Sequence, residues 1–90
     1  MKKKIAVHLA EGFEEIEAIS IIDVLRRAEL DVVVVSITVK KEVTGAHQIV
    51  VLADMLFDQV DYDEIYMIVL PGGMPGAANL NAHAGLKAQI

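Results

Sequence analysis

The chain has 90 residues, of which 54% are hydrophobic, and its 8 Lys and Arg residues are outnumbered by 13 Asp and Glu residues, for a formal net charge of -5. An acidic chain whose basic residues cluster only at residues 2–4 lacks the positive patch that nucleic-acid binding requires. The apolar run that follows, residues 5–10, is interrupted by His8 and is too short for a signal peptide or a membrane span. We therefore expect a cytoplasmic protein with no nucleic-acid or membrane partner.

The chain contains no cysteine, which excludes disulfides, thiolate metal sites and a cysteine nucleophile within these 90 residues. The hydrophobic fraction is high for this length, because a domain this small buries only about 60–65% of its unfolded surface. The excess predicts burial against another chain or segment.

Apolar runs and helical periodicity predict a βαβ unit in the first half of the chain. Residues 4–10 form a short apolar run, residues 14–30 have helical periodicity, and residues 32–38 are rich in valine. A near-continuous valine run is typical of a parallel strand that is covered on both faces. We therefore expect the second strand to lie in the interior of a sheet.

The second half predicts a hairpin and a further strand. Residues 40–44 and 47–53 favour β structure and flank Gly45 and Ala46, which suit a tight turn at or near a sheet edge. Residues 54–61 predict a loop or short helical turn before a strand at residues 66–70, which we expect to lie parallel and adjacent to the first two strands. This order of elements predicts an α/β fold, a three-layer sandwich.

A glycine turn follows this strand. The sequence Leu70-Pro71-Gly72-Gly73 leads into a helix predicted from about Ala77, so unhindered N–H groups would lie at the carboxyl edge of the sheet, where open α/β sheets bind ligands. The spacing matches neither a dinucleotide fingerprint nor a P-loop. The turn suits an oxyanion pocket for carbonyl chemistry, or else is a tight turn with no role in ligand binding.

The first helix begins with carboxylates at residues 14–15, which complement its dipole. Helical spacing places Glu17 in one row with Ile21, Val24 and Ala28, the stripe expected to face the sheet. Burial there without a cation would raise the pKa of Glu17, so its carboxyl could donate a hydrogen bond near neutral pH. The alternative is that Glu17 lies at the edge of the stripe and reaches water.

The remaining polar residues predict no ligand. His8, His47 and His83 are scattered without the spacing of a metal site, so we predict no bound metal and no cofactor. Asp23 and residues 26–27 would gather on the opposite face of the helix from Glu17. Such a charged face is usually solvated and less often a subunit contact.

Four separated segments together resemble the ThiJ/PfpI superfamily, and most closely its Parkinson-associated deglycase and bacterial thiazole-biosynthesis-like branch. These segments are residues 5–18, 23–28, 43–45 and 68–80. They agree with the family in order and spacing along the whole chain. The resemblance implies a flavodoxin-like sandwich of the glutamine amidotransferase type, of which residues 1–90 would form the N-terminal half of a single domain.

The resemblance also implies roles for three residues. Glu17 matches a buried glutamate that hydrogen-bonds the family's reactive cysteine, Gly73 matches the glycine whose N–H helps to form the oxyanion pocket, and Gly72 supports that turn. In the family, the cysteine and its histidine partner come after the helix that is predicted here from about Ala77, so no residue of this chain is assigned to either role.

The same resemblance implies a homodimer, the C-terminal half of the fold as a partner, and a small aldehyde or glycated substrate. We expect an intact protein of the glyoxalase or deglycase type, while this chain alone should not turn over. Two alternatives remain: a non-enzymatic redox-sensing or chaperone-like protein, and a truncated fragment without independent activity.

Overall fold

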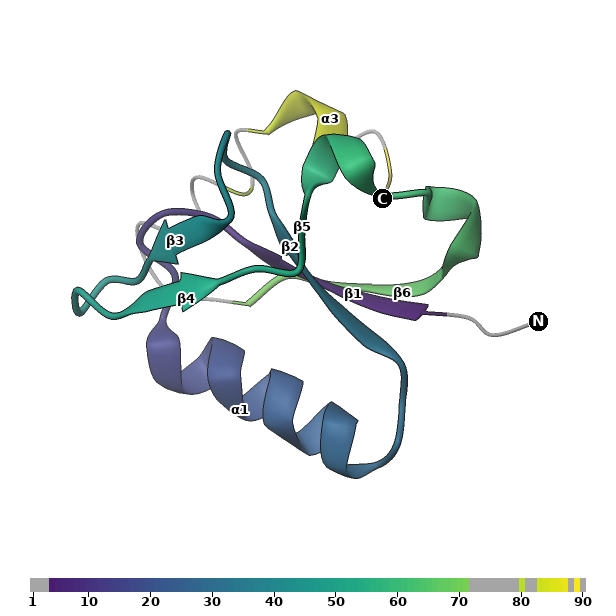
Figure 1. The fold of residues 1–90 in the computed structure, drawn as a ribbon, viewed down its shortest axis with the longest axis horizontal. Helices are drawn as coiled ribbons and strands as arrows, with labels where there is room; N and C mark the ends of the chain where they lie inside the picture. The colour runs from purple at the N-terminus through teal and green to yellow at the C-terminus, as the bar shows by residue number, and fades with distance from the viewer. Residues whose placement is uncertain (1–3, 72–79, 81–82, 88, 90) are drawn as a thin grey trace.

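The computed structural model describes residues 4–71, 80, 83–87 and 89, and its centre is a parallel sheet (Figure 1). The strand order is β5-β2-β1-β6. The sheet comprises β1 (Lys4–Leu9), β2 (Val32–Ser36), β5 (Met55–Leu56) and β6 (Ile65–Val69). Because β1 pairs in parallel with both β2 and β6, the three predicted strands are parallel and adjacent, as expected. The second strand is interior, as predicted, because β2 also pairs with β5.

The valines of β2 explain why this strand lies inside the sheet. All five of its residues are buried. Val32 and Val34 pack into the core beneath the first helix, whereas Val33 and Val35 pack into a second core on the opposite face, with Ala6 of β1. β-Branched side chains at four successive positions, residues 32–35, therefore cover both faces at once, which an alternating polar pattern could not do.

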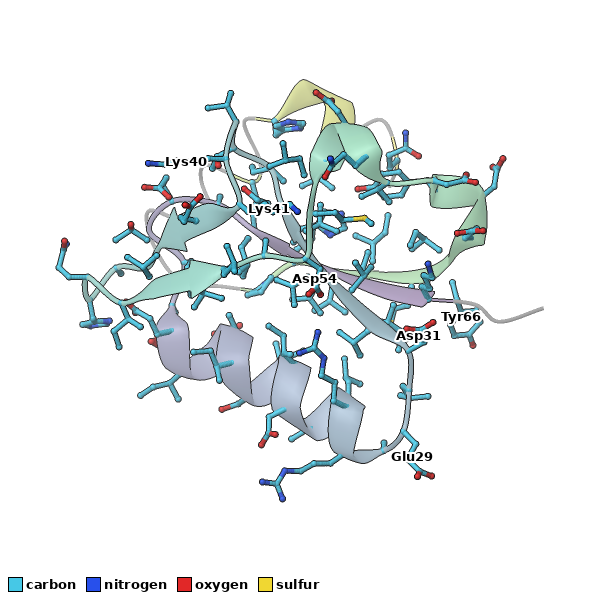
Figure 2. The ribbon with its side chains drawn as sticks, in the orientation of Figure 1. Glu29, Asp31, Lys40, Lys41, Asp54 and Tyr66 are labelled. Atoms are coloured by element: carbon cyan, nitrogen blue, oxygen red, sulfur yellow. The ribbon has the colours of Figure 1, made fainter. Side chains whose placement is uncertain are left out.

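The helix α1 (Glu15–Arg27) covers one face of the sheet and is shorter at both ends than predicted. Glu14 is its N-cap, and the Glu14 side chain accepts a hydrogen bond of 3.1 Å from the backbone N–H of Ile16. At the other end Glu29 adopts a left-handed φ of 63° and donates its N–H to the carbonyl of Arg26 (Figure 2). This backbone turn closes the helix and directs the chain into β2.

The stripe by which α1 faces the sheet is not the predicted one. Its buried residues are Glu15, Ala18 and Ile22. Glu17 is exposed, and Val24 is 63% exposed. Apolar residues occur on several sides of this helix, so the periodicity permits more than one orientation, and the hydrogen bonds of Glu15 to the hairpin turn, together with packing on β1 and β2, select the one that buries Glu15. The prediction that Glu17 lies on the sheet-facing stripe is therefore wrong.

The predicted hairpin is confirmed, with a different extent. It consists of β3 (Glu42–Thr44) and β4 (Val50–Leu52), which pair antiparallel. They form a separate two-stranded sheet rather than an edge of the main one. The turn spans residues 45–49 and is closed by a hydrogen bond from the N–H of Gly45 to the carbonyl of Ile49, so it is longer than Gly45 and Ala46.

The second face of the sheet is covered by short elements, so the three-layer arrangement is confirmed. These elements are the 3-10 turns η1 (Phe57–Gln59) and η2 (Tyr62–Glu64) and the helix α3 (Ala84–Lys87). The glycine turn and the start of the predicted last helix fall in residues 72–79, outside the described residues. Within the described ranges, no helix combines the length and apolar character that crossing a membrane requires.

A histidine lies in the core of this second face. His8 is fully buried, and its Nε2 atom lies 2.6 Å from the hydroxyl oxygen of Tyr62, whose ring stacks on the imidazole. Burial disfavours the imidazolium ion and lowers the pKa of His8 to about 4. Burial also raises the pKa of Tyr62 to about 12. Both groups are therefore neutral near pH 7 and share one hydrogen bond.

We expect acid to weaken the fold through His8. Its pKa falls from an ordinary value of 6.5 to about 4 on folding, so in this window the unfolded chain binds a proton that the folded chain does not. The free energy of unfolding should therefore fall as the pH falls from 6.5 to 4, by about 3 kcal/mol in total. Urea unfolding at several pH values measures this slope.

The matched control is the double variant His8→Leu/Tyr62→Phe, which removes the titrating group and the hydroxyl that it bonds. Its stability should depend less steeply on pH in the same window. Identical slopes in the two proteins would contradict the assignment of acid sensitivity to His8.

Candidate functional site

The candidate site lies at the carboxyl edge of the parallel sheet. The strands β1, β2 and β6 run in parallel and end here, and α1 begins here after a short connection from β1 (Figure 1). Open α/β sheets bind ligands at this edge, because strand ends and helix N-termini direct backbone N–H groups toward it. The fold alone thus brings the start of α1 to the same edge as the end of β6.

Of the three residues predicted for the site, the structure describes only Glu17. Glu17 lies in the first turn of α1 at this edge, with an exposed side chain. Gly72 and Gly73 follow the buried Pro71 and lie outside the described residues. The burial expected around Glu17 is not supplied by the residues that the structure describes, so the catalytic roles of Glu17, Gly72 and Gly73 stay predictions.

The buried carboxylate at this edge belongs to Glu15, whose side chain is only 4% exposed. Its Oε2 atom accepts hydrogen bonds from the backbone N–H groups of His47, at 2.7 Å, and Ile49, at 3.3 Å. Its Oε1 atom lies 2.8 Å from Nδ1 of the His47 ring. The carboxylate therefore binds the turn of the hairpin through both of its oxygens.

The surroundings of Glu15 keep it ionised. Burial alone would raise the pKa of its carboxyl, but the hydrogen bond from the His47 ring and the backbone N–H groups of His47 and Ile49 outweigh burial and lower this pKa to about 2. The hydrogen bond with Glu15, and then the negative charge of Glu15, raise the pKa of His47. Glu15 and His47 thus form an ion pair whenever the imidazole is protonated.

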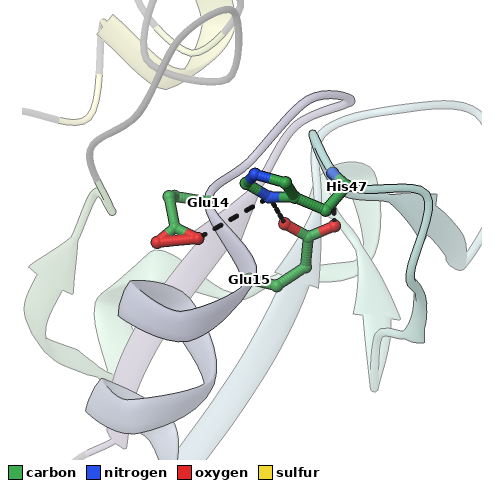
Figure 3. A group of neighbouring side chains, drawn as sticks. All are labelled: Glu14, Glu15 and His47. Atoms are coloured by element: carbon green, nitrogen blue, oxygen red, sulfur yellow. Dashed lines mark hydrogen bonds and ion pairs between the residues drawn. The ribbon is translucent and has the colours of Figure 1, made fainter.

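Glu14 completes a cluster of three side chains. Its Oε1 atom lies 4.0 Å from Nδ1 of His47, the same ring nitrogen that Glu15 contacts (Figure 3). One nitrogen or oxygen of each residue lies within 4.8 Å of those of the other two. The His47 side chain is 71% exposed, so the cluster opens to solvent on the imidazole side.

Backbone hydrogen bonds explain why the hairpin lies against the start of α1. The N–H of Gly12 donates to the carbonyl of Thr44, and the N–H of Ala46 donates to the carbonyl of Phe13, each at 2.8 Å. The ring of Phe13 is buried in the core beneath α1. The loop before the helix is therefore fixed to the hairpin at both ends, which brings His47 to Glu15.

Sequence reasoning missed this cluster. In the sequence, residues 14–15 look like ordinary dipole partners and His47 like an isolated histidine, because His47 follows Glu15 by 32 positions. A signal was nevertheless present. Glu15, Ala18 and Ile22 follow helical spacing as well as the stripe of Glu17 does, so a carboxylate on a buried stripe was predictable, but not which one.

Comparison with known proteins identifies the family. The model of the DJ-1/PfpI family matches residues 3–89, and the chain belongs to this family. Protein DJ-1 homolog B of Arabidopsis thaliana is 43% identical over 74 residues, which are 82% of this chain and 17% of that protein. A deglycase of Thermococcus kodakarensis is 37% identical over 82 residues, which are 90% of this chain and 49% of that protein.

Solved structures confirm the fold. The oxidized DJ-1 of Toxoplasma gondii superimposes with a TM-score of 0.90 at 44% identity, over 97% of this chain and 47% of that chain. The chain thus spans about half, or less, of the length of the relatives that it matches. The family and fold class predicted from the sequence are confirmed, and the matched region corresponds to part of the family fold.

We expect Gly45→Ala to destabilise the contact between hairpin and helix. A methyl group at this position would overlap the carboxylate of Glu15. The carboxylate cannot turn away without losing hydrogen bonds to His47 and Ile49, so the substitution should cost about 1–3 kcal/mol in free energy of unfolding. Urea or thermal unfolding measures this cost.

The same substitution in a Glu15→Ala background is the control. The obstructing carboxylate is then absent, so Gly45→Ala should cost much less than in the parent chain. Equal costs in the two backgrounds would show that Gly45 is required for another reason.

Proposed function

We propose that this chain supplies the N-terminal half of a DJ-1/PfpI domain, and that the intact domain acts on reactive aldehydes or glycated groups. The observation that carries the proposal is the pairing of β1 with β6, because it puts the start of α1, with Glu17, and the end of β6 at one edge of the sheet. The relative named as a deglycase supports the substrate class.

The chemistry follows from the roles that the family implies. A thiolate from the remainder of the domain attacks the aldehyde carbon, a carbon–sulfur bond forms, and the carbonyl electron pair moves to oxygen. The N–H of Gly73, in the turn supported by Gly72, stabilises the resulting oxyanion, and the carboxyl of Glu17 donates a proton to it. This chain has no cysteine, so it should not turn over alone.

The sheet edge formed by β6 supports the idea of a missing partner half. β6 is the outermost strand on its side of the described sheet. Its residues Tyr66 and Met67 are 68% and 45% exposed, and Tyr66 is directed outward (Figure 2). An open strand with exposed apolar side chains favours pairing with a further strand. We propose that the C-terminal half of the fold covers this edge.

The outer face of α1 supports a homodimer. Ile16, Ile19 and Val24 are 77%, 44% and 63% exposed. Ile16 and Ile19 are neighbours at i,i+3 spacing, and contiguous exposed apolar side chains mark protein–protein contact sites. The three charged residues that the sequence places together on this helix form two separate ion pairs. Arg27 pairs with Asp23 at 2.9 Å on this outer face, while Arg26 pairs with Asp54 at 3.1 Å. We propose a dimer contact centred on Ile16.

We also propose a cytoplasmic location, which the acidic, cysteine-free composition favours.

The catalytic proposal is tested by Glu17→Gln in the natural protein that contains this chain, with methylglyoxal as substrate. The amide keeps the size of the side chain but removes proton transfer, so kcat should fall by about 100-fold or more. The melting temperature should barely change. Glu64→Gln, which alters a half-exposed carboxylate paired with Lys4, is the control and should leave kcat unchanged.

Undiminished turnover by the Glu17→Gln variant would remove Glu17 from the mechanism. A natural protein without any turnover would favour the redox-sensing or chaperone-like alternative. The intact mass of the natural protein, measured beside these assays, distinguishes the truncated-fragment alternative.

The dimer proposal predicts that this chain associates in solution and that Ile16→Lys weakens the association. A lysine ammonium buried at the contact would lose its hydration without gaining a partner. Sedimentation velocity at several concentrations measures the change. Val39→Lys is the matched control, because Val39 is 94% exposed and belongs to the connection between β2 and β3 rather than to α1. A wild-type chain that sediments as a monomer, or equal effects of the two substitutions, would contradict the proposed contact.

A further inference from the structure

We propose that Glu14, Glu15 and His47 form a binding site for a divalent transition-metal ion, and that zinc is the ion that fits best. Two carboxylates from the start of α1 and one imidazole from the hairpin turn converge, although the chain separates them by more than 30 residues (Figure 3). Their donor atoms all lie within 4.8 Å of one another. The three proposed ligands do not include Glu17, to which the proposed catalytic chemistry is assigned.

The donor set determines the class of ion. Zinc in proteins is bound by imidazole nitrogen and carboxylate oxygen, and sites with three such protein ligands keep a fourth position for water. Magnesium and calcium prefer oxygen donors only, so the imidazole of His47 favours a transition metal. The exposed side of the ring leaves room for the water ligand.

One of the two distances from Nδ1 of His47 to the carboxylate oxygens is shorter than a shared zinc ion requires, and the other is longer. Bonds of about 2.0–2.1 Å in tetrahedral geometry place two donor atoms about 3.3–3.4 Å apart. Nδ1 of His47 is 2.8 Å from the Glu15 oxygen and 4.0 Å from the Glu14 oxygen. A small movement of the exposed imidazole away from Glu15 and toward Glu14 would bring both distances close to that value. The nitrogen would release any bound proton to solvent as it binds the ion.

The protein already orients the least mobile ligand. The Oε2 atom of Glu15 is held by the backbone N–H groups of His47 and Ile49, which leaves Oε1 directed at the imidazole. Backbone donors of this kind fix the orientation of metal-binding carboxylates. Gly45 has no side chain to displace Glu15 from this position. Glu14 is also fixed at its backbone, as the N-cap of α1.

The net charge of the cluster favours the binding of a divalent cation. Two carboxylates face one imidazole, so the three side chains carry a net negative charge whether or not His47 is protonated. A divalent ion would neutralise both carboxylates. Because the ion would bind the folded arrangement and not the separated segments, it should also stabilise the contact between the hairpin and α1.

The absence of cysteine makes the test direct, because no thiolate in this chain can bind the ion. Titration of the purified chain with zinc chloride, followed by calorimetry, should show one ion per chain with a dissociation constant in the micromolar range. His47→Gln should weaken binding by about tenfold or more, and Glu14→Gln should also weaken it. Both substitutions leave the backbone hydrogen bonds of Glu15 intact, so the fold should survive.

The matched controls are His83→Gln and Glu64→Gln, which alter a histidine and a carboxylate outside the cluster and should leave the zinc affinity unchanged. Zinc should also raise the melting temperature of the parent chain and not that of His47→Gln. No binding at millimolar zinc, or equal affinity in the parent chain and His47→Gln, would overturn the proposal. So would equal binding of magnesium, which would indicate only nonspecific attraction of cations.

Discussion

The hydrogen bonds between the Glu15 carboxylate and the hairpin turn determine how the other parts of this structure fit together. A buried carboxylate needs donors, and the only way for Glu15 to reach the N–H groups of His47 and Ile49 is for the hairpin to lie against the start of α1. That contact fixes the rotation of the helix about its own axis. It therefore also decides that Glu17, two residues further on, is directed away from the sheet.

The parts of the fold that rest on local pattern were predictable from the sequence. Valine at four successive positions of β2 is compatible with little besides an interior parallel strand. The apolar run of β1 and the strand before Pro71 provide the neighbouring strands of the sheet. The strand–helix–strand order then predicts a parallel sheet of the α/β class. The family resemblance then identified the fold from separated motifs. Each motif reflects a backbone conformation that only neighbouring residues determine, so it can be recognised in the sequence.

The parts that failed depend on contacts between distant segments. α1 has apolar residues on more than one side, so its sequence does not state which side faces the sheet, and the hairpin makes that choice. The two residues of β5 are too few for any periodicity, and they form a strand only because β2 offers an open edge. The cluster of Glu14, Glu15 and His47 likewise exists only after the hairpin has docked.

Two carboxylates in one helical turn thus have opposite environments. Glu15 is surrounded by donors from its own chain, which stabilise its charge and make it a poor source of protons. Glu17 is exposed in the part of the chain that the structure describes, so any apolar surroundings must come from other residues that pack over it. The proton transfer proposed for Glu17 therefore depends on the assembled domain. The anionic contact of Glu15, two positions earlier in the helix, is made by residues of this chain alone.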